Sequence, residues 1–179
     1  MPERSLPMPA AVQARLWQEA GDMPAYVILD GAQNPSLLEA LYADHAPPWR
    51  CLFGGQLEPD MATVAPYLVE LEHSSAFTRR LLAEGWGQNW GVFLTSQLAL
   101  PALWRHVRQQ VHVYGPDMES LFFRFYDPRV MRNYLPTCPA GQLGSFFGPV
   151  DFYIAEGELP THAHAWPVAD GQLVAQGIG

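Results

Sequence analysis

The stretch Tyr26-Val27-Ile28-Leu29-Asp30-Gly31 decides the fold class, because a short apolar run ends there directly in a turn signal. Consecutive apolar residues that include two β-branched ones are typical of a buried strand, and Asp-Gly is typical of the turn that closes it. Similar short apolar runs recur along the chain. The predicted strands cover residues 26–31, 49–53, 67–71, 90–95, 111–114, 121–126 and 150–155.

Segments with helical spacing separate most of these strands. Between residues 100 and 111, apolar side chains fall at i, i+3, i+4, i+7 and i+11, which is the pattern of an amphipathic helix. Helix-capping residues mark other starts, at Asn34, at Ser74 or Ser75, and at Asp127. The predicted helices cover residues 9–20, 35–42, 75–84, 100–111, 128–135 and 142–147.

The order of these elements predicts an α/β fold, a single domain with a mixed β-sheet flanked by helices. Strands alternate with helices in the first part of the chain, and a short Gly-Pro-Asp connection predicts a hairpin within residues 111–126. A length of 179 residues and a hydrophobic content of 49% suit one domain with a sizeable core.

We expect three regions along the chain. Residues 1–24 form an N-terminal helix and its lead-in, and residues 25–155 form the main domain. Residues 156–179 are rich in Gly, Ala, Pro and His without a periodic pattern, which predicts a loosely ordered C-terminal tail. The N-terminus lacks the apolar core of a signal peptide, and no stretch of 18 apolar residues occurs, so we expect a cytoplasmic protein.

The charged residues exclude several kinds of function. All ten basic residues are arginine and lysine is absent. Schiff-base chemistry and the phosphate sites of kinases and P-loop proteins, which each need a lysine, are therefore excluded. The net charge of -8 disfavours binding to nucleic acid or to an anionic membrane surface. Residues 79–132, however, carry seven arginines and only four acidic residues. This asymmetry reflects either a solvated helix face or a local recognition surface.

The reactive side chains of the sequence form no pattern that predicts a catalytic residue, a cofactor or a metal. His162 and His164 share one side of an extended segment but have no third ligand at a recognisable spacing. Cys51 and Cys138 each lie in apolar surroundings, as small buried thiols do. The glycine-rich segment 85–90 follows a helix and precedes a strand, which is the wrong order for a dinucleotide loop.

Acidic residues offer one catalytic alternative. Asp30 ends a predicted strand, and Glu70 and Glu72 share one face of another, so Asp30 with either glutamate could divide acid and base roles in a small hydrolase. The other interpretation is a solvated strand edge. A third possibility for the whole chain is an immunity protein, because an acidic surface suits a basic toxin.

The segment Leu121–Val130 holds an arginine between aromatic residues. In a strand, Arg124 would share a face with Phe122 and Tyr126, which predicts a partly buried guanidinium that is stacked and paired with a carboxylate. This is either an internal ion pair that joins strand to helix or part of a contact surface for a protein partner. The predicted protein-binding residues are Arg124, Tyr126, Arg129, Trp86 and Trp90.

Several segments, taken in order, resemble a known family. They are Tyr26–Gly31, Ala65–Leu71, Trp90–Leu94, Leu121–Val130 and, later, Phe146–Val150. Together they resemble the Tap/Tec effector-adaptor (effector chaperone) family of bacterial type VI secretion, over roughly residues 25–155. The run Arg-Phe-Tyr-Asp-Pro-Arg at 124–129, followed by Phe-Phe-Gly-Pro at 146–149, is the most specific part.

This resemblance implies a cytoplasmic adaptor without catalytic activity. Such a protein binds a toxic effector and delivers it to the spike protein VgrG at the tip of the injection apparatus. The resemblance carries over no catalytic residues and no cofactor. The expected partners are therefore an effector and VgrG, with no nucleic acid and no membrane.

Overall fold

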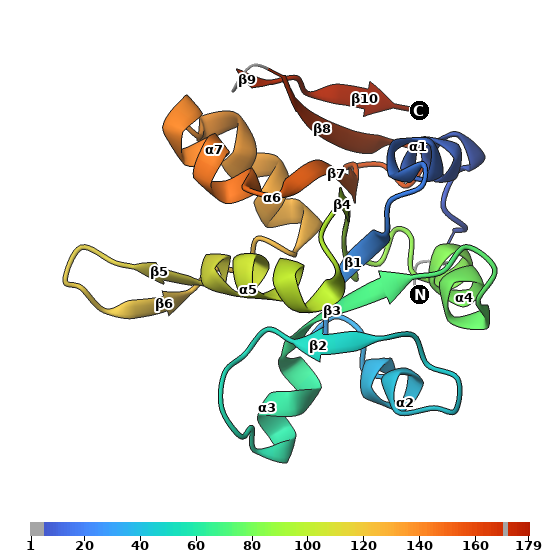
Figure 1. Cartoon of the computed structure of the whole chain (residues 1–179), viewed down its shortest axis with the longest axis horizontal. Helices are drawn as coiled ribbons and strands as arrows, with labels where there is room; N and C mark the ends of the chain where they lie inside the picture. The colour runs from blue at the N-terminus through green and yellow to red at the C-terminus, as the bar shows by residue number, and fades with distance from the viewer. Residues whose placement is uncertain (1–5, 170–171) are drawn as a thin grey trace.

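Strand β1 (Ala25–Asp30) lies at the centre of the computed structural model, which describes residues 6–169 and 172–179. All six of its residues are buried, as the apolar run Tyr26–Leu29 predicts. It pairs antiparallel with β3 (Pro66–Leu71) on one side and with β4 (Gly91–Ser96) on the other. The predicted α/β class, a single domain with helices around a sheet, is confirmed (Figure 1).

The sheet continues outward from these three strands in the order β10-β8-β7-β4-β1-β3-β2, and the short β9 also pairs with β8. Every strand pair in the described ranges is antiparallel. The helical segments between β1 and β2 and between β3 and β4 therefore connect strands that run in the same direction with one antiparallel strand between them, an arrangement that sequence alternation alone does not distinguish from a parallel sheet. The outer strands are β2 (Trp49–Cys51), β7 (Val150–Glu156), β8 (Ala163–Ala169), β9 (Gln172–Leu173) and β10 (Gln176–Ile178).

Helices cover both faces of the sheet, and each face has its own core. Val27 and Leu29 point into the first core, whereas Tyr26 and Ile28 point into the second, because successive strand residues alternate between faces. The first core contains side chains of α1 (Ala10–Ala20), α2 (Leu37–Leu41) and α4 (Ala76–Glu84). The second contains side chains of α5 (Leu100–Gln110), α6 (Pro128–Tyr134) and α7 (Ala140–Phe147). A 3-10 turn, Leu135–Thr137, follows α6.

Two of the expected helix caps are present. Ser75, rather than Ser74, begins α4, where its Oγ accepts a hydrogen bond from the Thr78 amide at 3.0 Å. Asp127 begins α6 and accepts from the Arg129 amide at 2.9 Å. Each cap satisfies a backbone donor that has no partner within the helix.

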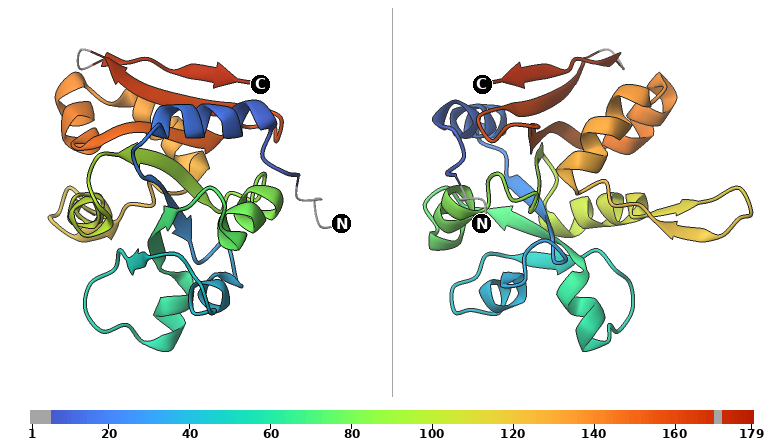
Figure 2. Two further views of the ribbon diagram at one scale, coloured as in Figure 1. Left: turned by 45° about the vertical axis from the view of Figure 1, so that its right-hand side comes forward. Right: turned by 180° about the vertical axis from the view of Figure 1, so that it is seen from behind.

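The predicted hairpin is confirmed and projects from the body of the molecule. It consists of β5 (His112–Tyr114) and β6 (Ser120–Phe122), and Figure 1 and the right-hand view of Figure 2 show it extending as an arm beyond α5. The prediction of a strand as far as Tyr126 is wrong, because β6 ends at Phe122. Phe125 and Tyr126 are both buried in the second core, so they do not alternate between two faces.

The expectation of a loosely ordered tail at residues 156–179 is wrong for most of that segment. Strand β8 pairs with β7 and buries Ala163, Ala165 and Trp166, and β9 and β10 pair with β8. The sequence of β8 does not predict a strand, because it contains small residues and a proline. Its residues are buried by pairing with the neighbouring strands β7 and β10. Residues 170–171 of the predicted tail, and residues 1–5 of the predicted lead-in, lie outside the described residues.

The structure also contains a helix that the sequence did not predict. Helix α3 (Pro59–Val64) occupies the segment expected to be a loop, begins with proline in its first turn and buries none of its residues. Helix α1, in contrast, buries Val12, Leu16 and Ala20 in the first core, so the N-terminal helix is part of the same domain as β1.

Candidate functional site

The carboxylate of Asp30 lies fully buried at the end of β1, and two donors compensate its charge. Its Oδ1 accepts from the Ala32 amide at 3.0 Å, and its Oδ2 accepts from the Arg124 guanidinium. The hydrogen bond to Asp30 is also the main reason why the pKa of Arg124 lies above its ordinary value. The central strand is thereby joined to the segment that follows the arm.

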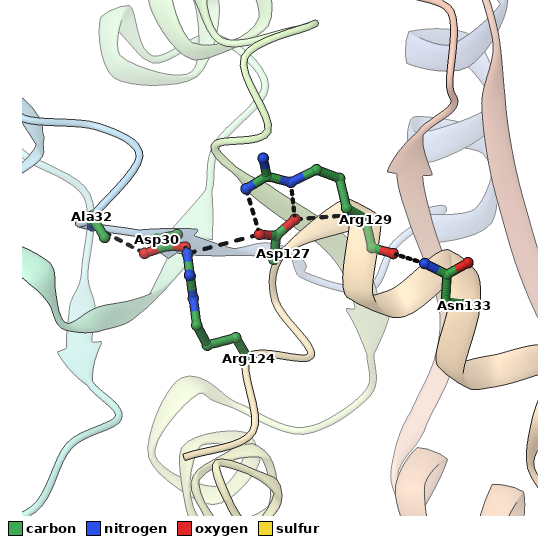
Figure 3. A network of polar contacts seen from close by, with 6 residues as sticks. All are labelled: Asp30, Ala32, Arg124, Asp127, Arg129 and Asn133. Atoms are coloured by element: carbon green, nitrogen blue, oxygen red, sulfur yellow. Dashed lines mark hydrogen bonds and ion pairs between the residues drawn. The ribbon is translucent and has the colours of Figure 1, made fainter.

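Asp127 forms the second half of the same polar network (Figure 3). Arg129 donates to it twice, from Nε at 2.9 Å and from a terminal nitrogen at 2.7 Å, and Arg124 lies 3.7 Å from the same carboxylate. Burial alone would raise the pKa of Asp127, but the hydrogen bonds from Arg129 and the charges of both arginines outweigh it and hold this pKa below its ordinary value. Two acids and two arginines thus form a compensated cluster.

The structure separates the predicted contact residues into two groups. Arg124 and Arg129 reach the surface, and the Arg124 side chain is 42% exposed. Tyr126 is buried in the second core, and Trp86 is buried with its Nε1 donating to the Pro160 carbonyl at 2.7 Å. Trp90 is partly buried against the first core. The network around Arg124 and Arg129 corresponds to the internal ion pair that the sequence left open as one interpretation.

The acids of the hydrolase alternative do not lie together. In the antiparallel register Asp30 is opposite Pro66, whereas Glu70 is opposite Tyr26. Asp30 and Glu70 are therefore four positions apart along the ladder, roughly 13 Å at about 3.3 Å per residue. Glu72 is exposed beyond the end of β3. Paired catalytic carboxylates in glycosidases lie about 5–9.5 Å apart, so neither glutamate forms such a pair with Asp30.

The remaining reactive side chains are dispersed. Cys51 and Cys138 are free and partly buried, and burial is the main cause of the raised pKa of Cys51. His164 stacks on Trp166, with ring centroids 5.6 Å apart. Within residues 6–169 and 172–179, no group of three or more His, Cys, Asp or Glu side chains is placed to hold a metal ion. In the same residues no helix combines the length and the apolar character needed to cross a bilayer.

A polar cleft of about 340 Å³ contains a residue that the sequence did not single out. Glu156, at the end of β7, is buried there and accepts a hydrogen bond from the Gly87 amide. Burial raises the pKa of Glu156 to about 7, although the Gly87 hydrogen bond and the Arg132 charge act in the opposite direction. Arg132 donates to the Glu156 and Gly157 carbonyls at 2.7 and 3.2 Å. No local sequence motif predicts this site, because the loop that covers the carboxylate contains Gly87, which is 69 residues away in the chain.

Fold and site define a single α/β domain with an antiparallel sheet, a projecting hairpin and a compensated ion-pair network at the end of its central strand. The profile of DUF4123, a domain of unknown function, matches residues 25–145, and the chain belongs to this family. The family is associated with type VI secretion effector adaptors. No curated protein and no solved structure gives a significant match.

Proposed function

We propose that the protein is a cytoplasmic adaptor that binds a type VI secretion effector and helps to load it onto the spike protein VgrG. The observation that carries this proposal is membership of DUF4123 over residues 25–145, a range that includes the central strand, the arm and the ion-pair network. The ordered motifs that resemble Tap/Tec adaptors lie largely in the same range.

We further propose that the protein acts by binding rather than by catalysis and needs no cofactor. The acids and arginines of the family-like segment Arg124–Arg129 compensate one another, as structural ion pairs do. Asp30, the most buried candidate acid, is held by Arg124 and lies far from Glu70. These contacts support a role for the segment in fixing the shape of the domain.

Co-expression tests the adaptor role directly. The protein is produced with VgrG and candidate effectors from the same genome, alone and in all combinations, and each mixture is separated by size-exclusion chromatography. We expect co-elution with the effector and a larger complex when VgrG is added. Elution of the protein by itself in every combination would exclude the adaptor role.

Gene deletion separates the adaptor from an immunity protein. Loss of an adaptor stops delivery of the effector and leaves the producing cell healthy. Loss of an immunity protein, in contrast, causes intoxication of the producing cell or of its siblings. Growth of the deletion strain together with its killing of a susceptible neighbour therefore distinguishes the two roles.

A further inference from the structure

Three arginines near the arm differ from those of the ion-pair network. Arg50 lies on the edge strand β2, and Arg105 and Arg108 lie on α5. Within the part of the chain that the structure describes, no carboxylate lies within ion-pair distance of these three, whereas Arg124 and Arg129 each have one. Their positive charge is therefore available for contacts outside the chain.

Trp104 holds two of these arginines in place. The guanidinium carbon of Arg108 lies 4.8 Å from the Trp104 ring centroid, and that of Arg50 lies 5.3 Å from it. The ring is itself fixed, because its Nε1 donates to the Cys51 carbonyl at 2.7 Å. A guanidinium that stacks on an aromatic ring keeps its N–H donors at its edge, where they can bind a carboxylate in a bidentate manner.

The cationic group continues into exposed apolar side chains. Arg108 lies over Gly54, where a Cβ atom would collide with its guanidinium. Phe53, the neighbour of Gly54, packs against Phe122 of the arm with ring centroids 4.7 Å apart. Further along the arm, Tyr114 is 70% and Met118 is 76% exposed. We name this continuous region the α5–arm surface. It comprises Arg50, Phe53, Trp104, Arg108, Tyr114, Met118 and Phe122.

We infer that the α5–arm surface binds an acidic segment of a partner protein that also carries aromatic or aliphatic side chains. In this arrangement Arg50 and Arg108 bind carboxylates of the partner, and Phe122 and the arm bind its apolar residues. Arginine and aromatic side chains dominate the energetics of protein interfaces. The inference rests on the proposed adaptor role in taking the partner to be a protein, and it assigns the face of the domain that the partner contacts.

The charges favour an acidic protein segment over other partners. A net charge of -8 repels a polyanion such as nucleic acid at long range, while a short segment with a few carboxylates meets mainly the local arginines. The arm carries Asp117 and Glu119 near its tip, which disfavours a phosphate backbone lying along it, whereas a partner whose carboxylates lie over α5 and whose apolar side chains lie over the arm avoids this repulsion. Two copies of the same acidic chain also repel each other.

The first experiment uses a defined probe and does not depend on the natural partner. Binding of a short random glutamate–tyrosine copolymer, with only a few carboxylates per chain, is measured by fluorescence anisotropy and compared with poly-glutamate of the same length and with a thymidine oligonucleotide. We expect the copolymer to bind most tightly and in a salt-dependent manner. The double variant Arg50→Glu/Arg108→Glu should weaken this binding by about tenfold or more.

Matched variants identify the surface. Arg79→Glu reverses an exposed arginine on α4, at the opposite end of the molecule from the arm, and should leave copolymer binding unchanged (Figure 1). Tyr114→Ser/Met118→Ser should reduce copolymer binding towards that of poly-glutamate, because it removes the apolar contribution. Circular dichroism verifies that each variant is folded.

Three results of the binding measurements would overturn the inference. They are absence of copolymer binding, equal binding by the Arg50/Arg108 double variant, and tighter binding of the oligonucleotide than of the copolymer. Dimerisation of the protein that the double variant abolishes would make a second copy the occupant and would also overturn it.

The co-expression complex separates this inference from the proposed function. If the wild-type complex forms and the double variant still co-elutes, the adaptor role stands and the assigned surface is wrong. If the wild-type protein binds the copolymer through these arginines but no complex forms with the effector or VgrG, the surface stands and the adaptor role fails.

Discussion

Arg124 has a structural task at the scale of single residues, because it is the charged partner of the buried Asp30 carboxylate. Replacing Arg124 by alanine leaves that carboxylate without its counter-charge, and we expect a loss of about 1–3 kcal/mol in the free energy of unfolding. Urea denaturation monitored by tryptophan fluorescence measures this loss. Arg80→Ala, which removes an exposed pair with Glu84, is the control and should cost under about 0.5 kcal/mol. Equal effects of the two changes would contradict the structural assignment of Arg124.

Glu156 makes the stability of the domain depend on pH. Its pKa of about 7 in the folded state lies above the ordinary value of 4.5, so the folded state binds the proton more tightly than the unfolded state does. The resulting stabilisation is complete below about pH 4.5 and is lost as the pH rises towards about 7. Glu156→Gln keeps an acceptor for the Gly87 amide but cannot ionise, so its stability relative to wild type should increase by up to about 3 kcal/mol between pH 5 and 8.

Denaturation curves of wild type and Glu156→Gln across this pH range measure the effect. Glu58→Gln, at an exposed glutamate before α3, is the control, because it removes a carboxylate without changing a buried site. A stability difference between wild type and Glu156→Gln that stays constant from pH 5 to 8 would mean that the buried carboxyl does not hold its proton in the folded state.

These residues also show which parts of the site the sequence can predict. Asp127 precedes a proline at a helix start, and Arg124 lies among aromatic residues, so a cap and a paired guanidinium follow from local patterns. The partner of Arg124 is 94 residues away in the chain, and Glu156 is buried by the Gly87 loop 69 residues away. Contacts of such separation depend on strand order, which no local pattern encodes.

At the scale of elements, the arm is an extension that the core does not need. Every residue of β5 and β6 is exposed, while Val111 at its base is buried. Replacing residues 113–121 by a short glycine–serine turn should therefore change the free energy of unfolding by less than about 1 kcal/mol. The same change should reduce binding of the glutamate–tyrosine copolymer to about the level of poly-glutamate, because it removes the apolar contacts of the arm and leaves Arg50 and Arg108 in place. Thermal unfolding and anisotropy measure the two effects, and a variant that unfolds would show that the arm supports the core.

The same scale explains why some elements were predicted and others were not. Helix α5 buries apolar residues at helical spacing, and strand β1 is a continuous apolar run that ends in a turn signal, so local patterns predict both. Strand β8 contains small residues and a proline, and α3 buries nothing, so neither carries a periodic apolar signal. Their positions follow from pairing with β7 and from the proline that begins α3.

At the scale of the whole molecule, the arginines divide by their partners. The sequence indicated residues 79–132 as arginine-rich, but it could not show that Arg124 and Arg129 are paired internally, while Arg108 has no carboxylate partner among the described residues. Arg50 lies outside that stretch and joins Arg108 only because β2 packs beside α5. An acidic protein can thus present a local positive surface beside an exposed apolar arm, which is a combination suited to protein recognition.

The extent of the folding unit is also a property of the whole molecule, and it can be tested by truncation. Strands β8 and β10 complete the sheet beyond β7, and Trp166 is buried in the second core. A chain that ends at Gly157 would expose Trp166's neighbours and one edge of β7. Burial of each large apolar side chain contributes about 1.5–3 kcal/mol, so the loss should approach the total stability of 5–15 kcal/mol typical of a domain. We therefore expect this truncated chain to be insoluble or to unfold without a cooperative transition.

A chain that ends at Ala169 keeps β8, and should remain folded with a lower melting temperature. Soluble yield, near-ultraviolet circular dichroism and thermal unfolding compare the two. Cooperative unfolding of the chain that ends at Gly157 would place the boundary of the folding unit near the end of β7, and would make the later strands an addition to a domain that is already complete.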